Sequence, residues 1–479
     1  MLALNPWLAR HSEIILLRKI AHRHRQQLVL VGGFLRDQWL GRNTRDLDFA
    51  VSRDAMAMAR RFAKAVKGAF VLLDDKTGCA RVAKKYPDGL WTYDFADFRA
   101  MTLKGDLAGR DFSVNTLTLD MACLDLEKPL IPQIKGGKRT WSDIKGKTIR
   151  VVGVKTFKED PLRLLRAYSL QAQLGFKMEP KTRALVKAQK SLISRVSPER
   201  VREEIFKVLA SSRAAATIKA MDRDGMLFEV MPQVRVMYKI EQGGFHHLNV
   251  WQHSLETLVQ LDKVLTLLAP DKLLQAYLDE EVGGGHSRLA LLRLACILHD
   301  IGKPDTKKKE PGGRTSFHTH EHAGRRIVRI MAGQLKLSTK ERYALEDMVL
   351  FHLRPGYLSN FKRPSDKAVY RYFRDTKENA VAVILLSMAD QKATRGPLTT
   401  AHDIQHHEDI CRPLIEAYFA QKKEEPRMRL LSGHDLIKEL ELEPGPLFSK
   451  ILLKVEEEQQ LGKIVTRQDA LAFARKQVT

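Results

Sequence analysis

Leu30–Asp37 reads LVGGFLRD: a short apolar run, a glycine pair and the start of a helix pattern. Glycines at a strand-to-helix turn let backbone N–H groups approach an anion closely, and the N-terminus of a helix favours negative charge. The guanidinium of Arg36 can bind phosphate oxygens at the same place. Taken alone, the glycine pair is more typical of a plain strand-to-helix turn, so an anion site here depends on residues further along the chain.

A pair of carboxylates comes next, in the segment Arg45–Phe49, RDLDF. In a strand, Asp46 and Asp48 project from one face, whereas the apolar residues between and after them point into the core. The two carboxylates repel each other unless a cation neutralises them, and hard oxygen ligands suit Mg²⁺. An isolated Asp-x-Asp is more typical of an acidic edge strand. After a glycine turn and an arginine, it predicts nucleotidyl transfer, in which metal ions activate a hydroxyl and hold a triphosphate.

Two later segments carry charged residues at helical spacing. Residues 109–117, GRDFSVNTL, predict a helix over residues 111–121, in which Asp111 and Asn115 share a face with Arg110 alongside.

Residues 159–167, EDPLRLLRA, predict the start of the next helix, with Pro161 in its first turn. At a spacing of three residues, Asp160, Arg163 and Arg166 share one face. Such a face fits either a ligand site or a surface ladder of salt bridges.

The composition is that of a basic globular protein with several domains. The 479 residues carry a formal net charge of +24, and the hydrophobic fraction of 44% argues against general disorder. A basic surface attracts polyphosphates, of which nucleic acid is the commonest. Four widely separated cysteines exclude a disulfide scaffold and a cysteine zinc site, and they fit a reducing compartment. No run of about 18 apolar residues occurs, so we expect no membrane span and a cytoplasmic protein.

Strand-like and helix-like patterns alternate over the first 150 residues, and helical periodicity dominates afterwards. This change predicts an α/β or α+β head followed by helical domains. The strand-like runs are residues 28–31, 47–51, 69–73 and 91–98.

The four quoted segments resemble, in the same order, the signature regions of the class II tRNA nucleotidyltransferase/poly(A) polymerase family of the DNA polymerase β superfamily. The resemblance continues in weaker form over nearly the whole chain. It implies that Asp46 and Asp48 are the catalytic ligands of Mg²⁺. It also implies a set of nucleotide-binding residues, of which the last three select the base: Gly33, Arg36, Arg110, Asp160, Arg163 and Arg166.

An Asp–Arg pair fits base selection in such a family. Cytosine and adenine both present an amino donor beside a ring-nitrogen acceptor, which complements a carboxylate beside a guanidinium. Guanine and uracil present the reverse pattern, and buried polar groups left unpaired cost about 1–3 kcal/mol each. One protein pair can therefore accept CTP and ATP and reject GTP and UTP.

The chain departs from the family pattern in the head and the helix after it. Gly109 and Ser169 stand where arginines are common in the family. The third carboxylate of a polymerase β-like site is not identified by the sequence, and Asp94 and Asp97 are weak candidates for which a strand-edge role is expected. One phosphate contact is expected to be missing.

A second group of potential ligands lies in the helical part of the chain. His253, the pair His299 and Asp300, and Asp390 follow one another on successive predicted helices, and imidazole with carboxylate suits Mn²⁺, Ni²⁺, Co²⁺ or Mg²⁺. This order resembles the HD family of metal-dependent phosphohydrolases, which occurs within some bacterial tRNA nucleotidyltransferases. The resemblance implies that these four residues bind a divalent transition metal or Mg²⁺, with phosphodiesterase or phosphatase activity. His320 is a candidate for assisting a second metal or binding phosphate, although the histidines around it equally fit a solvated loop.

The predicted organisation is a polymerase β-like α/β head over residues 1–150, a helical RNA-binding neck over 151–241, a helical HD domain over 242–420 and a helical tail over 421–479. The resemblance implies addition of CMP and AMP from CTP and ATP to the 3′ end of tRNA without a template, with the acceptor stem held by its backbone. Two alternatives stay open: an enzyme that adds only A or makes poly(A), and an RNA-binding phosphohydrolase with an inert head. The sequence does not predict the oligomeric state.

Overall fold

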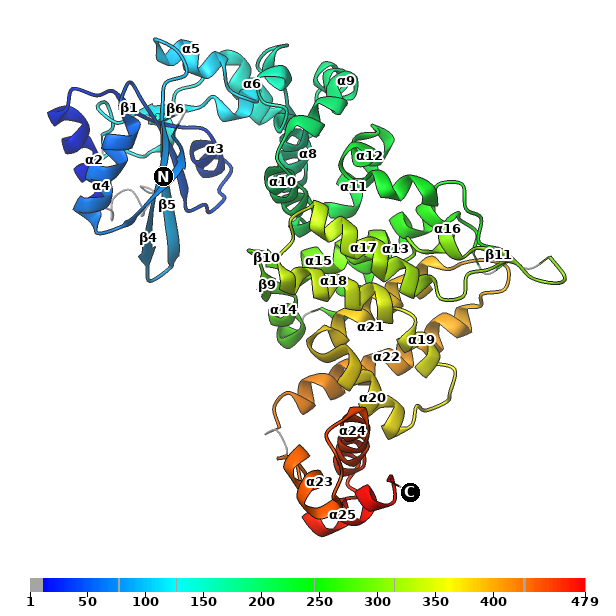
Figure 1. Ribbon diagram of the computed structural model, residues 1–479. Coiled ribbons are helices and arrows are strands. Elements are labelled where there is room, and N and C mark those ends of the chain that lie inside the picture. The colour runs from blue at the N-terminus through cyan, green and yellow to red at the C-terminus, as the bar shows by residue number, and fades with distance from the viewer. Residues whose placement is uncertain are drawn as a thin grey trace. The chain divides into compact units, whose positions relative to one another are not determined.

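The computed structural model describes residues 12–75, 78–125, 127–244, 246–269, 271–313, 315–424 and 428–478 (Figure 1). The chain forms two compact units, one of residues 1–204 with 224–229 and one of residues 205–223 with 230–479. The first unit contains an α/β sheet and the second is largely helical, which confirms the predicted fold class. In the described part of the chain, no helix is long and apolar enough to cross a membrane.

A six-stranded sheet in the order β3-β4-β5-β2-β1-β6 forms the centre of the first unit. β2 and β5 run parallel, and the other neighbouring strands are antiparallel. Four of the strands confirm the predicted runs. The strands are β1 (Leu28–Val31), β2 (Asp46–Val51), β3 (Ala69–Asp74), β4 (Cys79–Tyr86), β5 (Gly89–Asp97) and β6 (Thr118–Asp120).

Helix α4 (Ala55–Val66) covers one face of this sheet and packs against helix α2 (Ser12–Arg23). The ring of Phe62 on α4 meets Phe95 on β5 edge-on, and Phe95 stacks on Phe49 of β2 with 5.3 Å between ring centres. Aromatic pairs of this kind stabilise a core beyond their buried area. The apolar residues of β2 are therefore held against α4, and the alternation along the strand turns its two carboxylates to the opposite face.

The predicted helix over residues 111–121 is wrong. A single turn of 3-10 helix, η1 (Ser113–Asn115), is followed by strand β6. β6 pairs with β1 on one side, and Thr118 exchanges backbone hydrogen bonds with Lys135 on the other. Sheet hydrogen bonds on both sides thus outweigh the local helical spacing of the polar residues.

Helix α8 (Arg163–Leu174) begins at Arg163 rather than at Pro161, because Pro161 and Leu162 form a turn before it. It ends at Gly175, whose φ of 70° is the left-handed conformation that favours glycine. The other helical and paired elements of the first unit are α3 (Gly33–Trp39), α5 (Leu103–Ala108), η2 (Ile131–Gln133), α6 (Lys138–Lys145), β7 (Thr148–Ile149), α7 (Thr156–Glu159), β8 (Lys177–Met178), α9 (Pro180–Gln189), η3 (Lys190–Arg195) and most of α12 (Met226–Val230). Helix α10 (Pro198–Ala210) begins in the first unit and ends in the second.

Mutually packed helices form the centre of the second unit. All residues from Ala290 to Leu298 and from Ala380 to Ala389 are buried, as expected for helices surrounded by others. The central helices are α13 (Val250–Leu268), α15 (Arg288–Leu298), α17 (His320–Gln334), α18 (Thr339–Phe351) and α21 (Ala380–Ala393). Around them lie α11 (Ala214–Arg223), η4 (Pro232–Met237), α14 (Lys272–Asp279), β9 (Glu281–Gly283), β10 (His286–Ser287), α16 (Lys303–Thr306), β11 (Lys308–Lys309), β12 (Thr315–Ser316), α19 (Arg354–Leu358), α20 (Asp366–Thr376), η5 (Lys377–Asn379) and α22 (Ala401–Gln421).

The C-terminal helices α23 (Gly433–Leu440), α24 (Pro446–Gln460) and α25 (Arg467–Arg475) enclose a small core of their own. Leu436, Ile451 and other apolar residues fill this core. Ion pairs such as that between Arg371 on α20 and Glu457 on α24, at 2.6 Å, attach the cluster to the rest of the unit.

Candidate functional site

Three carboxylates from two adjacent strands lie on the sheet face opposite α4. Asp46 and Asp48 come from β2, and Asp94 comes from β5 directly opposite Asp48. Thr92 on β5 donates its hydroxyl to Asp46. The pKa of Asp48 is raised to about 6, because the surrounding protein reduces its hydration and because Asp94 and Asp46 add negative charge. Crowded carboxylates of this kind bind divalent cations well, and oxygen ligands suit Mg²⁺.

Asp94 is oriented by Arg81, whose guanidinium donates to both carboxylate oxygens at 2.7 and 2.8 Å. The structure separates Asp94 from the other weak candidate, Asp97. The carboxylate of Asp97 accepts a hydrogen bond from the backbone N–H of Ala55 at 2.8 Å and thereby fixes the start of α4. Asp94 is therefore the carboxylate placed beside the Asp46–Asp48 pair.

The glycine turn between β1 and α3 approaches these carboxylates closely. Gly32 has a φ of 81°, and a Cβ atom there would lie 3.8 Å from Oδ2 of Asp48 and 3.4 Å from the guanidinium of Arg110. Glycine adopts this conformation without steric cost. Gly33, the predicted contact residue, begins α3, so the conformational requirement belongs to Gly32.

The two arginines predicted to contact the nucleotide differ in their surroundings. Arg36 is buried, and its guanidinium donates to Asn115 and to Asp37. Arg110 lies against the glycine turn, and its positive charge opposes the rise in the pKa of Asp48. Arg110 is thus placed to meet an anion beside the carboxylates, whereas Arg36 holds the turn.

Asp111 and Arg166 form an ion pair between the head and helix α8. Two guanidinium nitrogens of Arg166 lie 2.9 and 2.8 Å from Oδ2 of Asp111. Burial alone would raise the pKa of Asp111, but the charge of Arg166 and hydrogen bonds from Asn115 and from the backbone N–H of Phe112 lower it to about 2. The predicted pairing of Asp111 with Asn115 is present, at 3.0 Å, although the segment is not a helix.

Replacing Asp111 by asparagine is expected to lower the free energy of unfolding at neutral pH. It is also expected to make the free energy of unfolding less sensitive to a fall in pH. The pKa of this carboxyl is about 2 in the fold against an ordinary 3.8. The resulting contribution of about 2 kcal/mol is complete above about pH 4 and is lost as the pH falls through about 2. Urea unfolding at about pH 6 and about pH 3 measures it. The variant should lose less free energy of unfolding between the two conditions than the wild type, and equal losses would contradict the assignment.

Asp160, Arg163 and Arg166 do not form one hydrogen-bonded set. Arg163 donates to the backbone carbonyl of Gly109 at 2.9 Å and lies 4.0 Å from Asp160. Asp160 precedes α8 and pairs with Arg200 at 3.0 Å, a partner that the sequence did not predict. Because α8 begins only at Arg163, the three side chains do not share a helix face as the spacing predicts.

Gly109 and Ser169, which stand where arginines are common in the family, differ in their surroundings. The guanidinium of Arg99 reaches the backbone carbonyl of Gly109 at 3.5 Å, so a positive charge is present where the sequence has lost one. Ser169 is buried and donates its hydroxyl to Glu204, which also lies 3.7 Å from Arg166. Arg99 therefore supplies a positive charge beside Gly109, whereas Ser169 leaves its position without one.

In the second unit, His253, His299, Asp300 and Asp390 lie together. His253 is on α13, His299 and Asp300 directly follow α15, and Asp390 is on α21. Nε2 of His253 lies 2.8 Å from Asp390 and 3.7 Å from Asp300, and Nε2 of His299 lies 3.6 and 3.3 Å from the same carboxylates. The ligand atoms of His253, His299 and Asp390 lie within 4.8 Å of one another, which is close enough for one metal ion.

The charges and free atoms of this cluster fit a divalent cation. Burial would lower the pKa of His299, but Asp300 and Asp390 raise it to about 10. The pKa values of both carboxyls fall well below their usual range despite burial, because of the neighbouring histidines and, for Asp300, also because of Lys303. Nε2 of His299 is buried without a hydrogen bond of good geometry within the described residues, whereas Oδ2 of Asp300 pairs with the ammonium of Lys303 at 2.7 Å. A cation bound there would satisfy the imidazole nitrogen, as buried polar groups require.

Two groups beside this cluster were not predicted from the sequence. Nζ of Lys303 lies 2.7 Å from Oδ2 of Asp300, and the ring of His246 meets that of His253 edge-on with 4.7 Å between centres. For Lys303, the available signal in the sequence was its spacing of three residues from Asp300. His246 precedes α13 outside any periodic pattern, so the sequence held no signal for it.

A cavity of about 580 Å³ opens beside Lys303 and His320. Its walls combine donors for an anion with apolar surface, which is the composition of a site for a small organic ligand. The other residues that line it are Gln242, Gly243, Gly244, His246, Gly313, Thr315, Ser316, Phe317, His318, Thr319, Glu321, Leu353, Tyr357 and Leu398.

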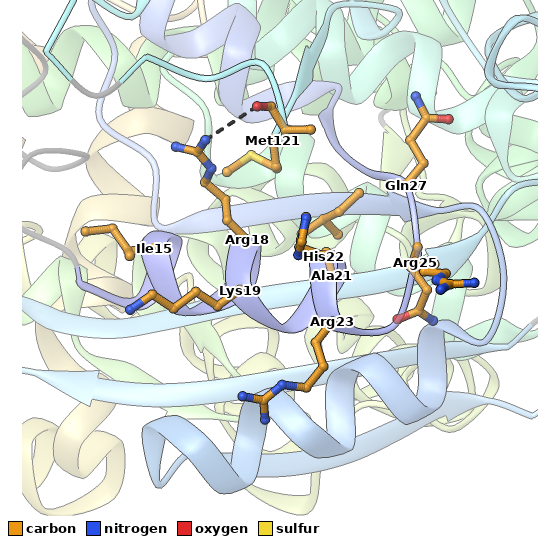
Figure 2. A pocket seen from close by; sticks show the side chains of 12 residues that line it. Ile15, Arg18, Lys19, Ala21, His22, Arg23, Arg25, Gln27 and Met121 are labelled. Carbon is orange, nitrogen blue, oxygen red and sulfur yellow. Dashed lines mark hydrogen bonds between the residues drawn. The ribbon is translucent and has the colours of Figure 1, made fainter.

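Another cavity, of about 1030 Å³, lies in the head beside α2 (Figure 2). Its basic side chains include Lys19, His22 and Arg23, and Arg18 donates to the carbonyl of Leu124 at 2.9 Å. None of the predicted site residues lines this cavity. The cavity is therefore separate from the carboxylate cluster.

Three family models match the chain. They are the poly A polymerase head domain over residues 28–150, the probable RNA and SrmB-binding site of polymerase A over 175–237, and the HD domain over 250–474. The HD match thus extends through most of the segment that the sequence patterns set apart as a separate tail.

Curated relatives and solved structures cover most of the chain. An A-adding tRNA nucleotidyltransferase of Deinococcus radiodurans is 32% identical, over 93% of this chain and 94% of the relative, and a CC-adding tRNA nucleotidyltransferase of Thermus thermophilus is 29% identical, over 92% of each. The solved complex of a CCA-adding enzyme with ATP has a TM-score of 0.62 at 17% identity, covering 97% of this chain and 95% of that one. The Thermotoga maritima CCA-adding enzyme complexed with tRNA has a TM-score of 0.57 at 17% identity, with the same coverage. The similarity to relatives over almost their full length places this chain in the tRNA nucleotidyltransferase/poly(A) polymerase family.

Proposed function

We propose that the protein adds CMP and AMP, from CTP and ATP, to the 3′ end of tRNA without a nucleic-acid template. The observation that carries this proposal is the cluster of Asp46, Asp48 and Asp94 beside the glycine turn, where a metal-bound triphosphate can lie. The names of the relatives, which include A-adding and CC-adding enzymes, support tRNA as the acceptor. The formal net charge of +24 supports binding of the acceptor stem through its backbone.

The residues of the head have separate roles in this reaction. Asp46 and Asp48 hold Mg²⁺, which when bound favours ionisation of the attacking hydroxyl and neutralises the triphosphate. Arg110 and the N–H groups of the glycine turn bind phosphate oxygens. Arg163 and Asp160 offer a donor and an acceptor to the base, and Asp160 must exchange its Arg200 partner for the amino group of cytosine or adenine. Selection therefore depends on a rearranged ion pair rather than on a preformed one.

We also propose that the HD domain hydrolyses phosphate esters. His253, His299, Asp300 and Asp390 would hold a divalent transition metal or Mg²⁺, which when bound supplies an activated water. Lys303 lies in the wall of the adjacent cavity, where it can bind a phosphate oxygen. The volume of the cavity, about 580 Å³, accommodates a nucleotide-sized ester.

Incorporation assays distinguish the proposed function from its alternatives. Purified protein is incubated with Mg²⁺ and with tRNA that ends before CCA, after C or after CC, and each labelled nucleotide is supplied separately. Addition of C and then A, stopping at the complete end, is the expected result. Incorporation of A alone would identify an A-adding enzyme, and long A tracts a poly(A) polymerase. Absence of incorporation, with ring opening of a 2′,3′-cyclic phosphate to its monoester, would leave only the hydrolase.

A further inference from the structure

The cavity beside helix α2 carries positive charge that no described carboxylate balances. It has a volume of about 1030 Å³, and of the 12 residues that line it five are basic and none is acidic. Within the described part of the chain, none of the five forms an ion pair with an aspartate or a glutamate. Unbalanced positive charge around a concave surface attracts anions. The five residues are Arg18, Lys19, His22, Arg23 and Arg25.

The stability of the helix accounts for only part of this charge. His22 and Arg23 lie in the last turn of α2, where basic side chains interact favourably with the helix dipole. Arg18 precedes that turn, and Arg25 follows the helix. Arg25 has a φ of 51°, the left-handed conformation that favours glycine, and its N–H donates to the carbonyl of His22 at 3.1 Å. The turn would form equally well with glycine, so it does not require the arginine side chain.

The guanidinium of Arg18 is already held in place at the cavity. It donates to the backbone carbonyl of Leu124 at 2.9 Å and to that of Ala122 at 3.4 Å, a bond drawn in Figure 2. These bonds use two of the five N–H groups of an arginine and leave the others for a ligand. A side chain that is already ordered loses less conformational entropy on binding. His22 lies one helical turn after Arg18, on the same face of α2.

The wall of the cavity also offers apolar surface and a hydrogen-bond acceptor. Leu28 and Met121 are buried apolar residues of this wall. Gln26 lines it as well, and its Nε2 donates to the backbone carbonyls of Arg53 at 2.7 Å and Asp54 at 3.3 Å. Because carbonyls only accept, these bonds fix the orientation of the amide, and its buried Oε1 has no donor among the described residues. An N–H group of a ligand would satisfy this acceptor.

The cavity differs from the carboxylate cluster of the head in both place and chemistry. Leu28 begins β1 and Met121 follows β6, whereas the glycine turn follows the other end of β1. At about 3.3 Å per residue, the two ends of this strand lie about 10 Å apart. The described residues that line the cavity include no carboxylate, so a ligand bound there needs no divalent metal ion.

We infer that the cavity beside α2 is a second nucleotide site of the head, which binds a free nucleoside phosphate without a metal ion. Phosphate oxygens contact Arg18, His22 and Arg25, the base lies against the apolar wall, and an amino group of the base donates to Gln26. A nucleotide combines all three properties that the wall offers, whereas an inorganic anion provides only the charge. The volume of about 1030 Å³ is sufficient for such a ligand. An RNA strand would need a longer basic groove, and here the basic residues are confined to residues 18–25.

Equilibrium dialysis of the full-length protein with labelled ATP in EDTA tests the inference. Arg25→Gly should weaken ATP binding at least about tenfold, because a charge-assisted hydrogen bond to phosphate is lost. Its melting temperature should equal or exceed that of the wild type, since glycine suits the φ of 51°. Lys67→Gly is the matched control, because Lys67 is an exposed basic residue with a φ of 54° outside the cavity, and it should keep ATP binding. Arg110→Gln, at the phosphate contact of the proposed catalytic site, should keep it as well.

Arg18→Gln and His22→Gln provide independent variants, and circular dichroism melting shows whether each is folded. ATP should bind at least about tenfold more tightly than adenosine or inorganic triphosphate. Equal binding of ATP and inorganic triphosphate would overturn the inference in favour of a simple polyanion site. Binding of oligo(A) without binding of ATP would overturn it in favour of an RNA surface. ATP binding that is lost in Arg110→Gln and unchanged in Arg25→Gly would overturn it too. Because EDTA removes the metal, these results do not depend on whether the head transfers nucleotides.

Discussion

Asp48→Asn should reduce nucleotide incorporation by at least about a thousandfold and leave ester hydrolysis by the HD domain unchanged. Asparagine preserves the shape of the side chain but removes a negative charge from the centre of the Asp46, Asp48 and Asp94 cluster. Groups that stabilise a transition state electrostatically are typically worth about a hundred- to a thousandfold each, and a proposed metal ligand is at the upper end. Single-turnover incorporation of labelled CTP and ring opening of a 2′,3′-cyclic phosphate to its monoester measure the two activities.

Asp75→Asn is the matched control, because Asp75 is an exposed carboxylate of the same unit outside the cluster. Loss of both activities in Asp48→Asn would contradict the separation of two sites.

Asp48→Asn should also stabilise the metal-free protein. An acid whose pKa is raised to about 6 in the fold costs stability increasingly as the pH rises from its ordinary 3.8 through about 6, so its removal raises the melting temperature at neutral pH. A lower melting temperature would contradict the electrostatic account.

Gly302→Ala should unfold or severely loosen the HD site while nucleotide incorporation persists. A Cβ atom on Gly302 would lie 2.1 Å from the backbone carbonyl oxygen of His320 and 2.4 Å from the backbone nitrogen of Gly324. Neither atom belongs to a flexible side chain, so the start of α17 would have to move away from Asp300. Overpacking of this kind typically costs about 1–3 kcal/mol or more. The expected results are a lower melting temperature, weaker Mn²⁺ binding and reduced ester hydrolysis.

Gly333→Ala provides the opposite control, on the helix that Gly302 approaches. Gly333 lies inside α17, and a Cβ atom there would meet no atom within 4 Å. Because alanine favours the helix over glycine by about 1 kcal/mol, this variant should be as stable as the wild type or more so. Equal behaviour of the two variants would show that the close approach at Gly302 does not position His320.

The sequence predicted the features of the head that follow local periodicity. Asp46 and Asp48 alternate with buried residues, so their common face could be read from residues 45–49 alone. Asp94 could not be chosen over Asp97, because its position depends on the parallel pairing of β2 with β5, which joins distant parts of the chain. Strand β4 was missed as well, since its lysines obscure the alternation of buried residues.

Helical spacing predicted the positions of side chains less well where tertiary contacts compete with the local structure. The pairing of Asp111 with Asn115 is present, but on a 3-10 turn before a strand. Asp160 lies outside α8 and turns to Arg200, a residue distant in sequence. In the HD domain the order of His253, His299, Asp300 and Asp390 predicted a cluster, whereas the proximity of His352 to Asp300 depends on the packing of α18 against α15.

One kind of hydrogen bond recurs in this cluster: a histidine Nδ1 donates to the backbone carbonyl three residues earlier. His299 donates in this way to Cys296, His320 to Phe317 and His352 to Val349. The local backbone therefore aims these rings whether or not a cation is bound, and protein stripped by a chelator should refill without refolding. Without a cation, the facing Nε2 atoms of His320 and His352, 3.2 Å apart, would both be acceptors when the rings are neutral. We therefore expect the melting temperature of the HD domain to rise when a divalent cation is supplied.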